Sequence, residues 1–142
     1  MTDEERFEAF GDFDPAAHED EARERWGETA QYAEAQRRTK AYTNDDWLRY
    51  RREADVVGEA LAALLDAGVP PDDPRTLAAA EQHRLLMDRW FYPCSPRMHA
   101  ALGALYIADP RFTATFEEVR PGLAQYLRDA TAAALEAAGP AG

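Results

Sequence analysis

Two histidines and the single cysteine are the residues of this sequence whose types could do chemistry together. His83, Cys94 and His99 follow one another at spacings of eleven and five residues. These spacings match no common zinc pattern, and one cysteine excludes an internal disulfide. Either histidine could serve as the proximal ligand of a haem. We favour the simpler interpretation, partly buried polar side chains, and predict no catalytic residue, metal or cofactor.

Three consecutive aromatic side chains lie between these residues. Trp90, Phe91 and Tyr92 end a predicted helix and are followed by Pro93 and Cys94. Successive side chains on a helix point in different directions, so the three rings cannot all face one side of a core. Either at least one of them lines a groove, or the segment is a tight corner packed on both sides.

Helix start signals define the elements that must position these residues. At four places a capping side chain directly precedes a proline, and Thr43 with Asp46 resembles a capping box. The sequence shows no alternating strand pattern and no Asn-Gly or Asp-Gly hairpin. We therefore predict an all-α fold with helices near 3–10, 15–26, 30–41, 44–67, 74–91, 96–108, 110–118 and 121–138.

The predicted 44–67 helix has the clearest apolar periodicity. Its large apolar residues recur at spacings of three and four and form one stripe: Trp47, Tyr50, Ala54, Val57, Leu61 and Leu64. Gly103 lies inside the predicted 96–108 helix, where glycine costs about 1 kcal/mol relative to alanine. We expect another backbone or a ligand to pack closely at that position.

Length and charge restrict the class of protein. The 142 residues fit one domain, and 46% hydrophobic residues are enough for a globular core. The net charge of −11 repels phosphate backbones, so we expect no nucleic-acid partner. The sequence carries no apolar run long enough for a membrane span and no signal peptide, and we expect a cytoplasmic monomer that contacts no membrane.

The first 42 residues differ from the rest of the chain. They contain no Leu, Ile or Val, and twelve acidic residues stand against six basic ones. Because little aliphatic surface offsets the entropy cost of ordering this segment, it should be the least stable part of the fold. We predict a division into a ligand-ordered lid segment (1–42), a helical core (43–138) and a frayed tail (139–142).

Long strings of the sequence resemble TipAS-type antibiotic-recognition domains, in the same order along the chain. They are FGDFDPAAHEDEARERWG (Phe10 to Gly27), RRTKAYTNDDW (Arg37 to Trp47), AEQHRLLMDRWFYPCSPRMHAALGALYIADPRFT (Ala80 to Thr113) and RPGLAQYLRDA (Arg120 to Ala130). The resemblance implies a globin-like helical fold with a ligand cleft and mobile N-terminal helices that order on binding. Such domains sense or sequester thiopeptide antibiotics such as thiostrepton, and related domains recognise albicidin.

The resemblance also shapes the expected mode of action. Domains of this kind usually follow a helix-turn-helix and a coiled coil in MerR-type regulators, and we expect a free-standing version here. In a thiopeptide-binding relative a cysteine captures the drug covalently, and the resemblance places the matching position at Ala101, seven residues beyond Cys94. We expect non-covalent binding, or at most slow capture through the nearby Cys94 as a substitute. We therefore expect binding and sequestration of a bulky peptide antibiotic without turnover. The alternatives are an interaction module acting on a separate MerR-type regulator, or a globin-like sensor or enzyme.

The predicted ligand-binding residues are mostly aromatic, and we expect about half of them to be ordinary core. They are Phe10, Phe13, Trp26, Tyr32, Trp47, His83, Trp90, Tyr92, Cys94, Met98, His99 and Ala101.

Overall fold

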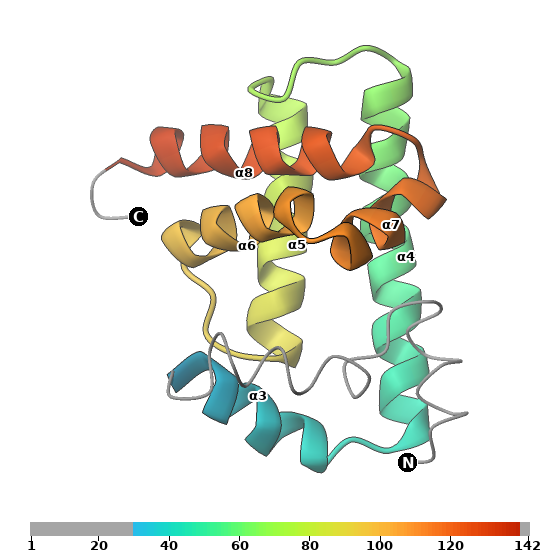
Figure 1. Ribbon diagram of the computed structural model, residues 1–142, viewed down its shortest axis with the longest axis vertical. Coiled ribbons are helices and arrows are strands. Elements are labelled where there is room, and N and C mark those ends of the chain that lie inside the picture. Colours follow the sequence, from blue (N-terminus) through green and yellow to red (C-terminus); the bar gives the residue numbers. More distant parts are fainter. Residues whose placement is uncertain (1–29, 140–142) are drawn as a thin grey trace.

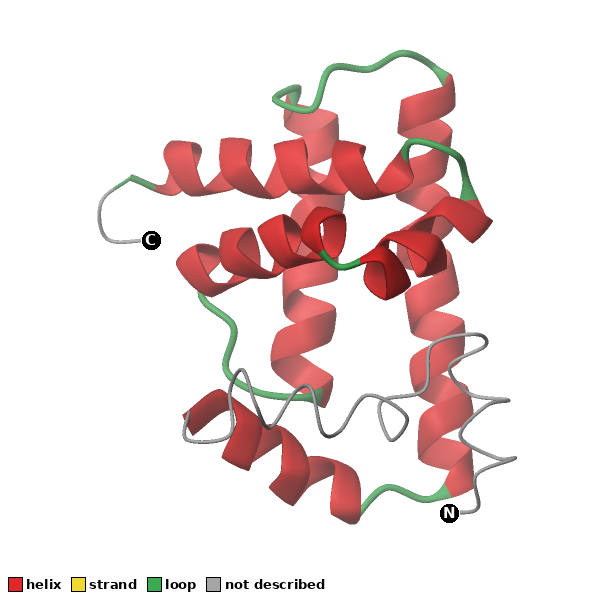
Figure 2. Ribbon diagram, viewed as in Figure 1, coloured by secondary structure: helices red, strands yellow, loops and turns green. Residues whose placement is uncertain are grey.

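The computed structural model describes residues 30–139, with the exception of the Tyr32 side chain. The predicted helices 3–10 and 15–26 therefore lie outside the described residues. Within residues 30–139 the chain is all-α, as the sequence predicts, and contains no strand (Figure 2). Its helices are α3 (Ala30–Lys40), α4 (Asn44–Asp66), α5 (Pro74–Trp90), α6 (Pro96–Ala108), α7 (Pro110–Val119) and α8 (Leu123–Ala138).

The predicted start signals act as caps. The Thr43 hydroxyl accepts from the Asp46 N–H, and the Asp46 carboxylate accepts from the Thr43 N–H at 2.9 Å, which completes the capping box of α4. Asp73, Ser95 and Asp109 cap the proline-led helices α5, α6 and α7 in the same way. These local signals explain why the predicted helix starts agree with the structure.

Glycine ends α4 and displaces the start of α8. Gly68 has a φ of +72° and donates to the Leu65 carbonyl, which closes the end of α4. Gly122 has a φ of +91°, and α8 begins one residue later, two residues after the predicted start. The Glu117 carboxylate accepts from the N–H groups of Gly122 and Ala124, so a side chain of α7 caps α8.

The helices form two crossed layers with α3 at one end (Figure 1). α4 and α5 run alongside each other, α6 and α8 cross them, and α3 lies across their lower ends. α6 and α8 meet closely at Gly103: a Cβ added there would lie 2.3 Å from Thr131 Oγ1 and 3.3 Å from Arg128 Cα. The expectation of a close contact at Gly103 is confirmed, and the neighbours are the Thr131 side chain and the Arg128 backbone of α8.

The core lies between α4, α5, α6 and α8. Its most buried members include Leu61, Leu102, Leu123 and Leu127, and the predicted stripe of α4 faces it. By contrast, no side chain of α3 that the structure describes is buried. No helix within residues 30–139 has the length and apolar character needed to cross a bilayer.

Candidate ligand-binding site

An aromatic cluster lies where α3 turns into α4 and where α5 ends. We call Tyr42, Trp47, Tyr50, Trp90 and Phe91 the aromatic corner. The Tyr42 ring meets the rings of Trp47 and Trp90 edge-on at centroid distances of 5.1 and 5.3 Å. Tyr50 meets Trp90 and Phe91 edge-on at 5.7 and 5.2 Å. Edge-to-face pairs of this kind hold large flat side chains in defined orientations, each worth about 0.5–1.5 kcal/mol beyond burial.

The Trp90 ring is held at its N–H edge and over one face. Its indole N–H donates to Glu53 Oε1 at 3.0 Å, and the Arg89 guanidinium lies over the ring at 5.6 Å from the centroid. Arg89 also pairs with the same Glu53 oxygen at 3.2 Å. The corner is therefore a preformed aromatic platform with one charged edge.

The loop after Trp90 is tied back to α5 through Cys94. The Asp88 carboxylate accepts from the Cys94 N–H at 2.7 Å, and Arg84 donates to the Cys94 carbonyl at 2.7 Å. Both backbone groups of Cys94 are thereby fixed. This anchoring lets the three consecutive aromatic residues adopt a tight turn, with Trp90 buried and both Phe91 and Tyr92 half-buried. The segment is a tight corner, and whether Phe91 or Tyr92 lines a ligand groove stays a prediction.

The two histidines predicted as ligand-binding residues are hydrogen-bonded to each other. His83 Nδ1 and His99 Nε2 lie 2.8 Å apart, and the rings are stacked at 24°. Burial, reinforced for His83 by its partner, lowers the pKa of His83 to about 3, and burial lowers that of His99 to about 4. The pair is therefore neutral near pH 7 and shares one bridging proton. Both rings are buried, at 6% and 2% exposure, and each satisfies a polar atom of the other, so the geometry favours the polar-core interpretation.

Cys94 is a protected thiol. Its side chain is 1% exposed, and Sγ donates to the Ser95 carbonyl at 3.8 Å. Burial raises the pKa of the thiol to about 11. Ala101, in contrast, is exposed on α6. The one sulfur nucleophile of the sequence is thus buried and protonated, while the accessible position carries a methyl group.

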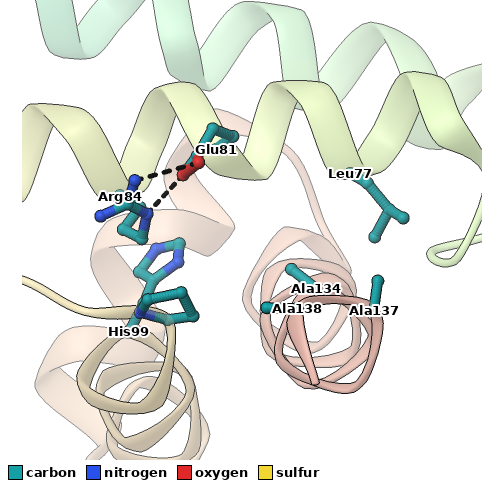
Figure 3. Close-up of a pocket in the computed structure, with 8 residues that line it drawn as sticks. Leu77, Glu81, Arg84, His99, Ala134, Ala137 and Ala138 are labelled. Atoms are coloured by element: carbon teal, nitrogen blue, oxygen red, sulfur yellow. Dashed lines mark hydrogen bonds and ion pairs between the residues drawn. The ribbon is translucent and has the colours of Figure 1, made fainter. Parts of the chain in front are cut away.

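A shallow groove of about 190 Å³ lies between α5, α6 and α8. Figure 3 shows Glu81, Arg84 and His99 at one end of the groove and Leu77 with three alanines of α8 at the other. Of the predicted site residues that the structure describes, only His99 lines it. The groove is separate from the aromatic corner.

The structure brings only some of the predicted residues together. Trp47 and Trp90 share the aromatic corner, but at 4% and 5% exposure they present little surface to a ligand. Tyr92 and Met98 are half-buried and pack on the core beside the corner. Phe10, Phe13, Trp26 and the Tyr32 side chain lie outside the described residues, so their assignment stays a prediction.

Several residues of the corner were not predicted as ligand residues. Tyr42, Tyr50 and Phe91 complete the aromatic network, and Tyr106 packs nearby against Phe116 at a centroid distance of 4.7 Å. Tyr50 could have been found, because it lies three residues after Trp47 on the same face of the helix.

A comparison with known protein families matches residues 18–134 to the TipAS antibiotic-recognition domain. The chain belongs to this family. It is therefore a recognition domain rather than an enzyme, and the resemblance read from the sequence is confirmed. The match includes the aromatic corner, the paired histidines and Cys94.

Relatives and solved structures agree with this assignment. The chain is 47% identical over 130 residues to the HTH-type transcriptional activator TipA of Streptomyces coelicolor, covering 92% of this chain and 51% of TipA. It is 34% identical over 133 residues to the HTH-type transcriptional regulator SkgA of Caulobacter vibrioides, covering 92% of this chain and 52% of SkgA. The chain thus spans about half the length of these curated relatives.

One solved structure matches nearly the whole chain. TipAS in complex with nosiheptide, from a thiopeptide antibiotic multidrug resistance system of Streptomyces lividans, superposes with a TM-score of 0.92 at 45% identity. The match covers 99% of this chain and 98% of that one.

Proposed function

We propose that this domain binds and sequesters thiopeptide antibiotics of the nosiheptide and thiostrepton type. The observation that carries the proposal is the fold match to a nosiheptide-bound relative over nearly the whole chain, combined with the aromatic corner. Thiopeptides are rich in flat heteroaromatic rings, and half-buried aromatic edges are suited to stack on them. Capture is stoichiometric and leaves the drug chemically intact.

The binding surface in this proposal includes the half-buried apolar residues around the corner. Phe91, Tyr92, Met98 and Phe112 combine partial exposure with packing against the core. Their exposed parts can contact a ligand while their buried parts stay packed against the core. Trp47 and Trp90 act as buried supports that also report on the site through their fluorescence.

The proposal includes a lid role for α3. The apolar side chains of α3 that the structure describes are Ala30, Ala33 and Ala35, so undocking them removes little apolar contact. The preceding segment is equally poor in aliphatic side chains. Ligand contacts then supply the apolar partner that this part of the chain lacks.

We further propose that the domain acts as a cytoplasmic monomer. Its exposed large hydrophobic side chains within residues 30–139 are Val56, Leu85, Ile107 and Val119, and each lies on a different helix. Scattered apolar residues of this kind are ordinary for a monomer. The relatives support the cytoplasmic location, because both are named as HTH-type transcriptional regulators and such proteins act on DNA.

Titration with nosiheptide, thiostrepton and albicidin, followed by tryptophan fluorescence, tests the proposal. We expect saturable binding of both thiopeptides at micromolar affinity or better. Tyr92→Ala should weaken binding about tenfold, which corresponds to about 1.4 kcal/mol, whereas Leu85→Ala on the outer face of α5 should leave it unchanged. Absence of any fluorescence or calorimetric signal with both thiopeptides would refute the proposal.

A further inference from the structure

The carboxyl end of α5 is closed in an unusual way. The last four carbonyls of a helix have no partner within the helix and need one elsewhere. In α5 the Met87 carbonyl accepts from the N–H groups of Phe91 and Tyr92, at 2.9 and 3.3 Å. Phe91, at the C-cap position, has a φ of −121°, so the left-handed glycine turn that often ends a helix is not used here. Three carbonyls remain to be satisfied.

All three accept hydrogen bonds from α3 and the turn that follows it. Arg38 Nη1 donates to the carbonyls of Asp88 at 2.6 Å and Arg89 at 3.3 Å. The Tyr42 hydroxyl donates to the carbonyl of Trp90. A guanidinium is well suited to this position, because the carboxyl end of a helix carries partial negative charge.

Glu34 orients the arginine. Its carboxylate accepts from Arg38 Nε at 2.6 Å, one helical turn away on the same face of α3. Hydrogen bonds from Arg37 and Arg38 lower the pKa of Glu34 to about 2, so the carboxylate is ionised at neutral pH. The fork of Arg38 is therefore held between its own helix and the end of α5.

Arg38 joins α3 to the core through hydrogen bonds to α5. Its side chain and that of Glu34 are only 24% and 23% exposed, and α3 meets the body of the protein at the carboxyl end of α5. That end carries the aromatic corner. These hydrogen bonds involve no apolar side chain of the core, so losing the Arg38 guanidinium should loosen α3 more than the packing of α4 to α8.

We propose that Arg38 is a positioning residue for ligand retention: it clamps α3 onto the carboxyl end of α5, beside the aromatic corner, and so slows the escape of a bound thiopeptide. This inference rests on the proposed function and adds the residue that sets the residence time. Arg38 need not touch the ligand, because it acts through the position of α3.

Arg37→Met is the matched control for Arg38→Met. Both arginines lie on α3, both bind Glu34, and both substitutions remove one positive charge. The Arg37 side chain is 72% exposed, and its hydrogen bonds among the described residues go to Glu34 rather than to α5. Arg38→Lys tests for partial rescue, because an ammonium can reach one partner but cannot reproduce the planar fork.

Stopped-flow fluorescence with nosiheptide measures the ligand arm. We expect Arg38→Met to raise the dissociation rate about tenfold and to change the association rate less than threefold. Arg37→Met should stay within twofold of the parent protein in both rates, and Arg38→Lys should lie between the two. Equal dissociation rates for Arg38→Met and the parent, or for the two methionine variants, would overturn the proposal.

Hydrogen exchange without ligand measures the attachment itself. Arg38→Met should speed exchange of the amides at 34–40 about tenfold while leaving those of α4 to α8 unchanged. Faster exchange throughout α4 to α8 would indicate a general structural role and would overturn the positioning role. If the parent protein binds no thiopeptide, the proposed function and the retention role both fail, and exchange still decides whether Arg38 holds α3.

Discussion

Replacing Gly103 by alanine tests the close contact between α6 and α8. A Cβ at this position would lie 2.3 Å from Thr131 Oγ1 and 3.3 Å from Arg128 Cα. Thr131 is 1% exposed, and its hydroxyl donates to the Arg128 carbonyl at 2.8 Å, so rotating it away would break this hydrogen bond. Because Arg128 Cα is also close, we expect α6 and α8 to move apart to make room.

The magnitude follows from two opposing effects. Overpacking of this kind costs about 1–3 kcal/mol, and alanine returns about 1 kcal/mol of helix propensity. We expect Gly103→Ala to lower the free energy of unfolding by up to about 2 kcal/mol, and to lower the Tm by up to about 8 °C for a domain of this size. Urea denaturation and calorimetry measure both quantities.

Gly58→Ala is the matched control, because it makes the same change inside helix α4. There, among the described residues, the added Cβ would meet only Val119 Cγ1 within 4 Å, at the relaxed distance of 3.9 Å. This variant should gain up to about 1 kcal/mol. The double variant Gly103→Ala, Thr131→Ala should be less destabilised than the two single changes add up to. A Gly103→Ala protein as stable as Gly58→Ala would refute the reasoning.

Three further predictions concern titration, the thiol and α3. The pKa values of His83 and His99 in the folded protein lie below the ordinary 6.5, so below pH 6.5 the unfolded chain binds more protons than the folded one. The free energy of unfolding should therefore fall as the pH drops from 6.5 towards 5. Urea unfolding at several pH values measures this dependence, and His99→Gln should make it less steep. Intact-mass spectrometry after incubation with thiostrepton at pH 7 should show no rapid adduct, because the buried Cys94 thiol has a raised pKa; a fast adduct that is lost in Cys94→Ala would contradict this. In the ligand-free protein the amides of α3 should exchange faster than those at 47–64 and should slow on thiopeptide saturation, and equal protection before ligand would argue for a preformed site.

The helices could be predicted from the sequence because their signals are local. Thr43, Asp73, Ser95 and Asp109 cap the helices that directly follow them, so a few adjacent residues determine each start. The start of α8 was missed by two residues because its capping carboxylate, Glu117, belongs to the preceding helix. A cap supplied from another element leaves no adjacent sequence signal.

The site was less predictable because its contacts join distant parts of the chain. Arg38 meets Asp88 across 50 residues, and Tyr42 meets Trp90 across 48. Residue type led to the prediction of Trp47 and Trp90 as ligand residues, but type alone does not say whether a ring is buried as support or exposed to a ligand. That distinction depends on what packs behind each ring, which only the assembled fold defines.

The burial of the Cys94 thiol and the position of Arg38 together indicate how this protein would retain a drug. A protein that forms a covalent bond to its ligand through an accessible thiol retains the ligand even when its lid opens. Here Ala101 occupies the exposed position on α6, and Cys94 is buried and protonated. In the proposed function, retention then depends on non-covalent contacts, and the dissociation rate measures how long they hold the drug. An element that covers the site becomes decisive under these conditions, so the clamp between α3 and α5 should matter more in this protein than in a relative that captures its ligand covalently.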